Sequence, residues 1–244
     1  MSATFSNQLV VLTGATSGIG LASARRLLAE GAEVIGIARN ADKLDRVARE
    51  LGPNFQPTTC DLSDRLSRAA LSEHLRKLAR PVDIFLSNAA ECVYASPLEL
   101  ASAELCHLFE VNVLAAIELC QVLVPLMRSG SRLVQVSSVA ARHLPNAKFS
   151  PYAASKAALE QFTEGLRLEL HPRGIHVSLL VPGLVDTPIY DHVPSFAATR
   201  QKINRDVPTW LSADDVADAL LWILSRPSHV VVTELVVMPD RQAR

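Results

Sequence analysis

Short apolar runs alternate with amphipathic stretches along the whole chain. The runs are rich in Val, Ile and Leu, which is typical of parallel strands buried on both faces of a sheet. Between them, apolar side chains recur at helical spacing, as at Leu21, Ala24, Leu27 and Leu28, and this repeat stops at Gly31. The pattern predicts strands at residues 9–12, 33–38, 56–60, 83–87, 132–136, 175–181 and 234–238.

Helical patterns separate these strands, at residues 18–30, 41–51, 63–79, 101–128, 151–171 and 213–225. Strands joined by helical crossovers predict an α/β fold with a doubly wound, seven-stranded parallel sheet flanked by helices on both faces. The 244 residues suit one domain over 1–244. The segment at about 183–211 has no clear pattern and is too long for an ordinary connection, so we expect it to form a lid over a substrate site.

A glycine-rich turn, Thr13-Gly-Ala-Thr-Ser-Gly-Ile-Gly, follows the first strand and opens the first helix. This is the context that a dinucleotide-binding turn requires. Gly14 would allow the tight turn, while Gly18 and Gly20 would let a cofactor and the sheet approach the backbone at the helix N-terminus, whose dipole favours phosphate. A glycine triplet alone could be an ordinary turn, but its position here predicts a dinucleotide site.

Tyr152 and Lys156 lie four residues apart in a predicted helix, which places both side chains on one face. A lysine ammonium in that position favours the ionised form of a neighbouring phenol. Free tyrosine titrates near ~10, so an acid/base that works at neutral pH needs a shift of roughly three units. Such pairs also occur on solvated helix faces, but beside the glycine turn this one predicts a catalytic pair.

Bulk properties exclude several classes of protein. The net charge of −1 argues against a nucleic-acid partner. We expect no apolar stretch long enough to span a membrane, and the first residues lack the features of a signal peptide, which together predict a cytoplasmic protein without a membrane partner. The cysteines show no C-x-x-C pairing, so we expect no metal site and four buried, reduced thiols at Cys60, Cys92, Cys106 and Cys120.

Seven short motifs occur in order along the chain. They are Thr13-Gly-x-x-x-Gly-x-Gly, Cys60-Asp61-Leu62, Asn88-Ala-Ala, Val111-Asn112-Val113, Val136-Ser-Ser138, Tyr152-x-x-x-Lys156 and Pro182-Gly183-Leu-Val-Asp-Thr187-Pro. Together they resemble the short-chain dehydrogenase/reductase family over essentially the whole chain, which implies a single-domain Rossmann fold and an oxidoreductase. The tail from Ser212 to Pro239 also resembles the branch that acts on 3-hydroxy acids and related small alcohols.

The resemblance implies four catalytic residues. Tyr152 would be the general acid/base, and Lys156 would lower its pKa and hydrogen-bond the nicotinamide ribose. Ser138 would hold the substrate oxygen, and Asn112 would support a water chain that relays the proton. Taken alone, Ser138 could be a strand-end hydroxyl and Asn112 a satisfied polar residue in a long apolar helix.

The resemblance also implies the cofactor contacts. Asp61 would accept from the adenine amino group, Asn88 would brace the sheet edge, and Thr187 would bind the carboxamide or phosphates. Asp61 could instead cap the following helix, although Ser63 can serve that purpose. The expected cofactor-binding residues are Gly14, Thr16, Ser17, Gly18, Ile19, Gly20, Arg39, Asp61, Leu62, Asn88, Ala89, Tyr152, Lys156, Pro182, Gly183, Val185 and Thr187.

The end of the second strand indicates which cofactor is used. An NAD enzyme usually carries an acidic residue there, whereas this chain has Arg39, which can pair with the 2′-phosphate of NADP(H). A solvated surface arginine is the alternative interpretation. Ala90 replaces the family's usual glycine, and it would be strained if that position needs a positive φ.

Substrate is expected between residues 90–97, residues 139–151 and the lid, in contact with Ser138, His143, Tyr152 and Tyr190. We expect a small or medium ketone, keto acid or hydroxy acid, with a carboxylate-bearing compound, such as a 3-oxo acid or semialdehyde, slightly ahead of a neutral ketone. Basic lid residues favour a carboxylate, and Glu91 argues against one. The alternatives are a non-catalytic NADP-sensing protein and an NAD-dependent alcohol dehydrogenase. The family is commonly oligomeric, so we expect a homotetramer or homodimer.

Overall fold

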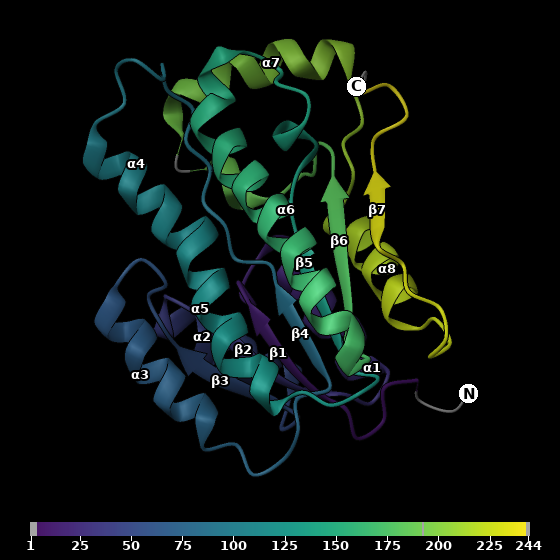
Figure 1. The fold of residues 1–244 in the computed structure, drawn as a ribbon. Coiled ribbons are helices and arrows are strands. Elements are labelled where there is room, and N and C mark those ends of the chain that lie inside the picture. Colours follow the sequence, from purple (N-terminus) through teal and green to yellow (C-terminus); the bar gives the residue numbers. More distant parts are fainter. Residues whose placement is uncertain (1–3, 192, 243–244) are drawn as a thin grey trace.

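The computed structural model describes residues 4–191 and 193–242 as a three-layer α/β structure (Figure 1). Its sheet contains seven parallel strands in the order β3-β2-β1-β4-β5-β6-β7. The order reverses between β1 and β4, which makes the sheet doubly wound and confirms the predicted Rossmann fold. The strands are β1 Leu9–Thr13, β2 Glu33–Ala38, β3 Phe55–Thr59, β4 Ile84–Ser87, β5 Arg132–Val136, β6 His176–Pro182 and β7 Glu234–Val237.

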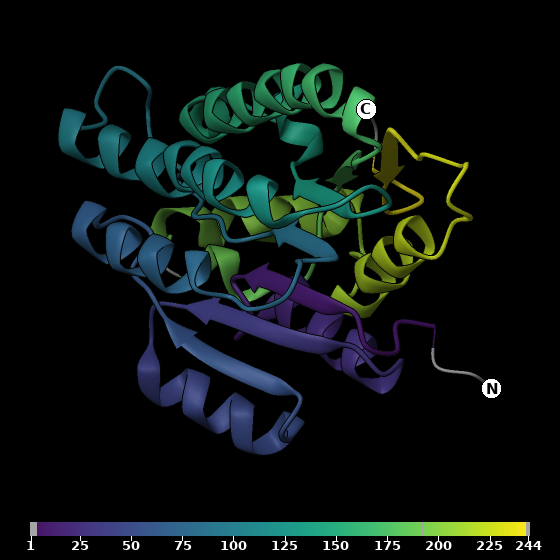
Figure 2. The same ribbon diagram turned by 60° about the horizontal axis from the view of Figure 1, so that its bottom comes forward.

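Helices cover both faces of the sheet (Figure 2). One face is covered by α1, α2 and α8, and the other by α3, α5 and α6. Each group of helices shares its own apolar core with the strands. The helices are α1 Gly18–Ala29, α2 Ala41–Leu51, α3 Arg65–Arg76, α4 Ser102–Phe109, α5 Ala115–Leu123, α6 Ser150–Leu170, α7 Ala197–Asp206 and α8 Ala213–Leu224.

Strand β1 shows how the apolar runs build both cores. All five of its residues are buried. Val10 and Leu12 join the core beneath α1 and α8, whereas Leu9 and Val11 join the core beneath α3 and α6. Since successive side chains of a strand point to opposite faces, a run without polar interruption must be covered on both sides.

The helical pattern at 101–128 is one continuous rod with a change of winding. Between α4 and α5 the segment Glu110–Leu114 is π-helical, a wide turn that is frequent at functional sites, and it contains Asn112. From Ser102 to Leu126 the rod is long and apolar enough to cross a membrane, so the expectation that no stretch reaches that length is wrong. In its most apolar stretch of 18 residues, 61% of the residues are buried inside the fold, where the rod packs against α3 and α6.

The expected lid segment is more structured than its sequence indicates. Val185 and Leu211 form an isolated parallel bridge, so the two ends of the excursion lie side by side. Between them lie the short 3₁₀ turns Pro188–Tyr190 and Pro194–Phe196 and the helix α7. Whether this segment moves over a substrate stays a prediction.

Two local expectations are wrong. Cys106 is exposed on α4, so only three of the four cysteines are buried. Helix α3 begins at Arg65, and its cap is Asp64, whose carboxylate accepts hydrogen bonds from the backbone of Leu66 and Ser67. Ser63 lies before that cap and donates to Asp61 instead, so neither Ser63 nor Asp61 caps the helix.

Candidate active site

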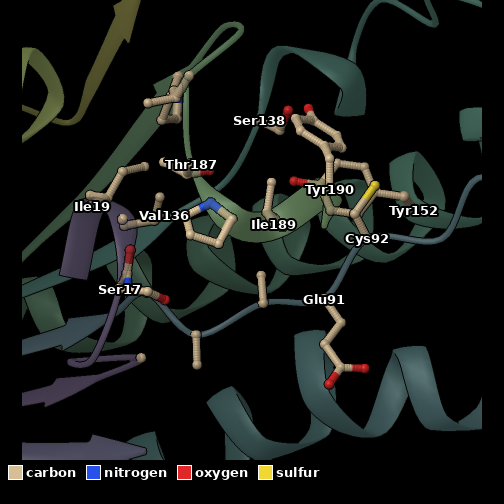
Figure 3. A pocket seen from close by; sticks show the side chains of 18 of the residues that line it. Ser17, Ile19, Glu91, Cys92, Val136, Ser138, Tyr152, Thr187, Ile189 and Tyr190 are labelled. Carbon is tan, nitrogen blue, oxygen red and sulfur yellow. The ribbon is translucent and has the colours of Figure 1, made fainter. Parts of the chain in front are cut away.

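A cavity of about 520 Å³ opens at the carboxyl ends of the strands, on both sides of the point where the strand order reverses. Ligands of doubly wound sheets bind in this position. Residues following β1, β2, β4, β5 and β6 line the cavity. Figure 3 shows Ser17 and Ile19 at one end, and Ser138, Tyr152, Tyr190 and Cys92 at the other.

The glycine-rich turn forms the first end of the cavity. Gly14 has φ +71° and Gly18 has φ +50°, a left-handed backbone that favours glycine. A Cβ at Gly20 would lie 2.2 Å from the carbonyl oxygen of Gly14, so Gly20 is required by packing within the turn. Ser17 is the N-cap of α1, and its side chain makes no capping hydrogen bond. The helix N-terminus therefore faces the cavity without a side-chain acceptor, as an anion-binding terminus should.

Asn88 links the end of β4 to the end of β1 through hydrogen bonds to Thr13. Its side-chain amide donates to the carbonyl oxygen of Thr13 at 3.0 Å, and the backbone N–H groups of Asn88 and Ala89 both donate to Thr13 Oγ1 at 3.0 Å. The next residue, Ala90, has an ordinary backbone, since Asn7 is the one non-glycine residue with positive φ in the part of the chain that the structure describes. The alanine at this position therefore introduces no backbone strain.

Helix α6 and strand β5 bring three of the four expected catalytic residues to the far end of the cavity. Tyr152 and Lys156 project from α6, and Ser138 follows β5. The ammonium of Lys156 donates to the carbonyl oxygen of Val136 at 2.8 Å and lies 6.0 Å from the centre of the Tyr152 ring. Both side chains belong to buried residues, so the pair is shielded from water rather than lying on a solvated helix face.

Asn112 lies behind the cavity rather than in its lining. Its amide nitrogen donates to the carbonyl oxygen of Glu91 at 2.9 Å and to Ser155 Oγ at 3.0 Å. Its amide oxygen accepts from the backbone N–H of Glu91 at 2.8 Å. The side chain therefore links the chain after β4 to α6, and its support of a water chain stays a prediction.

Burial dominates the protonation of the catalytic pair. It raises the pKa of Tyr152 well above the usual value, and the Ser138 hydroxyl opposes this increase. Burial also lowers the pKa of Lys156 to about 8, against the opposing influence of Cys92 and Glu160. Lys156 is not among the groups that shift the pKa of Tyr152 in this cofactor-free structure, and removal from water sets the direction of the shift. Tyr152 consequently keeps its proton at neutral pH, which suits a donor to a carbonyl oxygen.

Arg39 lies at the cavity mouth, paired with a carboxylate. Its Nη1 lies 3.1 Å from Glu91 Oε1, and the other oxygen of Glu91 lies 2.7 Å from His107 Nε2. The Glu91 side chain points away from Tyr152 and Tyr190 (Figure 3), so its charge belongs to the end of the cavity near Arg39. Whether Glu91 disfavours an acidic substrate stays a prediction, and the second lining cation, Lys43, was not anticipated from the sequence.

Six of the expected site residues do not line the cavity: Thr16, Gly20, Asp61, Leu62, Asn112 and His143. Although burial opposes it, hydrogen bonds from Ser63 lower the pKa of Asp61, and they engage one of its oxygens. His143 is exposed beyond the short turn Val139–Ala141 and does not line the cavity, so its contact with substrate stays a prediction.

The tyrosine end of the cavity rests on an aromatic cluster. Tyr190 stacks on Phe196 with ring centres 4.5 Å apart, and Phe149 and Tyr94 pack edge-on against Phe196. Tyr190 lines the cavity, and burial raises the pKa of its hydroxyl. Cys92, which the sequence did not single out, lies beside these rings, and burial raises the pKa of its thiol to about 12. The substrate end is therefore largely apolar.

The basic residues of the expected lid that the structure describes do not line the cavity. Arg200 pairs with Asp186 at 2.6 Å and packs over the ring of Trp210 at 4.8 Å. Lys202 and Arg205 are exposed and do not line the cavity. The remaining basic lid residue of the sequence argument, His192, lies outside the described residues. The structure thus gives no support to a carboxylate-binding lid.

Comparison with known proteins gives consistent likenesses. Residues 8–197 match the family model of the short chain dehydrogenases. A serine 3-dehydrogenase of Agrobacterium fabrum is 32% identical over 243 residues, covering 96% of this chain and 94% of that protein. A serine dehydrogenase complexed with NADP⁺ superposes with a TM-score of 0.88 at 26% identity, covering 97% of each chain. A short chain dehydrogenase of Burkholderia cenocepacia in complex with NADP gives 0.84 at 30% identity, covering 96% of this chain and 97% of that one.

Proposed function

The chain belongs to the short chain dehydrogenase family, and from that premise we propose that it is an NADP(H)-dependent oxidoreductase that interconverts a carbonyl compound and a secondary alcohol. The observation that supports this most strongly is the buried, protonated phenol of Tyr152 near Ser138, in the same cavity as the free N-terminus of α1. The experiment that tests it is a screen of ketones, keto acids and diketones for consumption of NADPH.

The residues divide the reaction between them. Bound NADP(H) supplies the hydride in reduction and accepts it in oxidation. In the direction of reduction, Tyr152 donates its proton to the substrate oxygen, and the Ser138 hydroxyl holds that oxygen by a hydrogen bond as negative charge develops on it. Lys156 places a positive charge beside the phenol that must lose its proton.

The cavity can hold the adenosine and phosphate parts of the cofactor. The uncapped N-terminus of α1 suits the pyrophosphate, while Arg39 and Lys43 suit the 2′-phosphate that distinguishes NADP(H) from NAD(H). Glu91 holds Arg39 in the cofactor-free protein, so a bound 2′-phosphate must compete with that carboxylate. We expect this competition to moderate the preference for NADP(H) without reversing it.

Two rival functions remain distinguishable. A non-catalytic NADP-sensing protein would not need the buried pair of Tyr152 and Lys156, which is intact. An NAD-dependent alcohol dehydrogenase would not need a cation at Arg39, which lines the cavity. Two features of the family carry over as proposals, namely a cytoplasmic homotetramer or homodimer, and closure of the 183–211 segment as a lid. Exposed leucines on α4, α6 and the π-helical segment between α4 and α5 suit an interface between copies, at Leu105, Leu114 and Leu168.

The proposed substrate is a small or medium-sized carbonyl compound. The relatives named serine dehydrogenases act on a small polar molecule that carries a carboxylate. In this chain Cys92, Ile189 and Tyr190 pack with Tyr152 and line the cavity beside it, and the described lid cations lie outside the lining. We therefore favour a neutral ketone of modest size over its acidic analogue.

Neutral ketones should be reduced at least as efficiently as matched 3-oxo acids, because no described lid cation is available to pair with a carboxylate. The measurement is kcat/KM for ketone and keto acid pairs of equal carbon number, at two ionic strengths. Screening by salt weakens attraction between charges, so the neutral ketone should show no salt dependence. A keto acid preferred about tenfold, with a preference that declines as salt rises, would contradict this prediction.

Replacing Lys156 with methionine should abolish most activity and weaken NADPH binding, yet stabilise the folded protein by about 1–2 kcal/mol at pH 7. Burial lowers the Lys156 pKa from 10.5 to about 8, which corresponds to about 3 kcal/mol of destabilisation, and the variant loses about 1 kcal/mol with the hydrogen bond to Val136. The measurement is the free energy of unfolding in urea.

The pH dependence of that stability difference follows from the lowered pKa. Below pH 8 the lysine is charged in both the folded and unfolded states, so the destabilisation is fully present. Between pH 8 and 10.5 the folded protein holds fewer protons than the unfolded chain, and the wild type gains stability relative to Lys156→Met. The difference in unfolding free energy between Lys156→Met and the wild type should therefore narrow towards pH 10.5. A difference that is constant with pH would contradict the lowered pKa of Lys156.

A further inference from the structure

A group of four polar residues extends from the cavity to strand β7: Ser137 lines the cavity, whereas Glu160, Arg142 and Glu234 lie outside its lining. Glu160 on α6 accepts a hydrogen bond from Ser137 Oγ at 2.7 Å through one carboxylate oxygen, and from Arg142 Nε at 2.8 Å through the other. The remaining nitrogens of Arg142 contact both oxygens of Glu234 on β7 at 2.8 and 2.5 Å. The Glu160 side chain is 16% exposed, whereas those of Arg142 and Glu234 are 32% and 39% exposed, so the contact with Ser137 is the better shielded part of the group.

This network encloses the short loop that carries Ser138. Ser137 immediately precedes Ser138, and Arg142 follows the turn Val139–Ala141 that comes after it. One carboxylate therefore anchors the loop on both sides of Ser138. Within the loop, Ser138 Oγ accepts only a local hydrogen bond from the backbone of Ala140, at 3.2 Å. The backbone N–H of Ser137 also donates to the carbonyl oxygen of Leu180 on β6, and Val139 packs with Leu179 and Val181, so Glu160 adds the side-chain anchor that joins the loop to α6.

Glu160 also shares a helix face with the catalytic pair. Tyr152, Lys156 and Glu160 follow one another at intervals of four residues along α6, which places them in successive turns on one side. The carboxylate that holds the Ser138 loop consequently belongs to the same rigid element as the phenol and the ammonium. This arrangement fixes the Ser138 hydroxyl relative to the Tyr152 hydroxyl, the two groups that must meet at one substrate oxygen.

The charge of Glu160 acts on Lys156 as well. The groups that influence the Lys156 ammonium are Tyr152 and Glu160 on its own helix and Cys92 from the chain after β4, with Arg142 beyond Glu160. Glu160 raises the pKa of Lys156, in opposition to burial. A neutral side chain at residue 160 would remove the negative charge that acts on Lys156 and pairs with Arg142.

We propose that Glu160 is a positioning residue of the active site, which orients the Ser138 loop and sustains the positive charge of Lys156. The proposal rests on the proposed function for its effect on turnover, but its effect on Lys156 exists without any substrate. An ion pair that merely joined α6 to β7 would behave differently, because Glu234 would then matter as much as Glu160. Glu234→Gln is therefore the matched control, since Glu234 shares Arg142 but does not contact Ser137.

The experiment compares Glu160→Gln with Glu234→Gln in the full-length protein. In Glu160→Gln we expect kcat to fall about tenfold or more with NADPH affinity changed less than about threefold, and the alkaline limb of the kcat/KM profile to move to lower pH by roughly half a unit to one unit. Glu234→Gln should keep kcat within about twofold and leave the limb in place. Equal effects of the two variants, or an unmoved limb in Glu160→Gln, would overturn the proposal.

A second readout needs no turnover. Lysine labelled with ¹³C at Cε reports its own titration by NMR, and the Lys156 signal is identified by its loss in Lys156→Met. We expect the Lys156 pKa to fall in Glu160→Gln by roughly half a unit to one unit and to stay unchanged in Glu234→Gln. An unchanged Lys156 titration in Glu160→Gln refutes the inference even in a protein that reduces no carbonyl compound. If the wild type reduces no carbonyl compound but Glu160→Gln still lowers the Lys156 pKa, the proposed function alone is refuted.

Discussion

Tyr152→Phe should abolish turnover while leaving NADPH affinity nearly unchanged. The hydroxyl of Tyr152 is the buried, protonated group that can supply a proton to the substrate oxygen. Loss of a positioned general acid typically lowers the rate by about 10²–10⁴-fold, which corresponds to about 3–5 kcal/mol in the barrier. The measurements are kcat with a responsive ketone and the Kd of NADPH by fluorescence titration. Retention of more than about a tenth of kcat would refute the assignment.

Tyr190→Phe is the matched control for that experiment. Tyr190 lines the same end of the cavity and is also largely removed from solvent, so the substitution deletes a second phenolic hydroxyl from the same surroundings. We expect this variant to change KM more than kcat, because its hydroxyl is proposed to touch substrate without donating the proton. A loss of kcat equal to that of Tyr152→Phe would show that the cavity is sensitive to any lost hydroxyl.

Arg39→Asp should reverse or erase the preference for NADP(H). The substitution replaces a cation that can pair with the 2′-phosphate by a carboxylate that repels it, next to a second carboxylate at Glu91. We expect kcat/KM for NADPH to fall about 10²-fold or more, equivalent to about 3 kcal/mol, whereas NADH should be used no worse than before. The measurement is kcat/KM for both cofactors with one ketone. A wild type that already favours NADH would end this argument.

Glu91→Gln is the companion to the Arg39 variant. It removes the charge that competes with the 2′-phosphate but keeps a side chain of the same size beside Arg39 and His107. NADPH should bind about threefold to tenfold more tightly and NADH about equally, because these exposed charges are screened by solvent. Equal tightening for both cofactors would show that Glu91 acts on the adenosine part in general.

The sheet and its helices could be predicted because their determinants are local. The apolar run of β1 had to be covered on both faces, and the glycine turn after it could serve only a strand followed by a helix. Tyr152 and Lys156 could be placed on one face by their spacing, and their grouping with Ser138 followed from the family resemblance; the structure brings all three to one cavity.

The parts that escaped prediction depend on contacts between distant segments. The ion pair of Arg39 with Glu91 joins the ends of β2 and β4, and neither residue alone indicates the other. The motif around Asn112 could not indicate its partners, which are the backbone of Glu91 and the hydroxyl of Ser155, reached from the π-helical turn. His143 depended on the path of one short turn, which leads to the surface.

The fate of the transferred hydrogen tests the central claim most directly. NADPH carrying deuterium at C4 of the nicotinamide, prepared in both stereoisomers, is mixed with a ketone that responds in the screen, and the product alcohol is analysed by NMR and mass spectrometry. The proposed function predicts that one of the two stereoisomers transfers its deuterium to the carbinol carbon, with one alcohol formed per NADPH consumed and none formed by Tyr152→Phe. Consumption of NADPH without a labelled alcohol, or binding of NADPH with no carbonyl compound reduced, would contradict it.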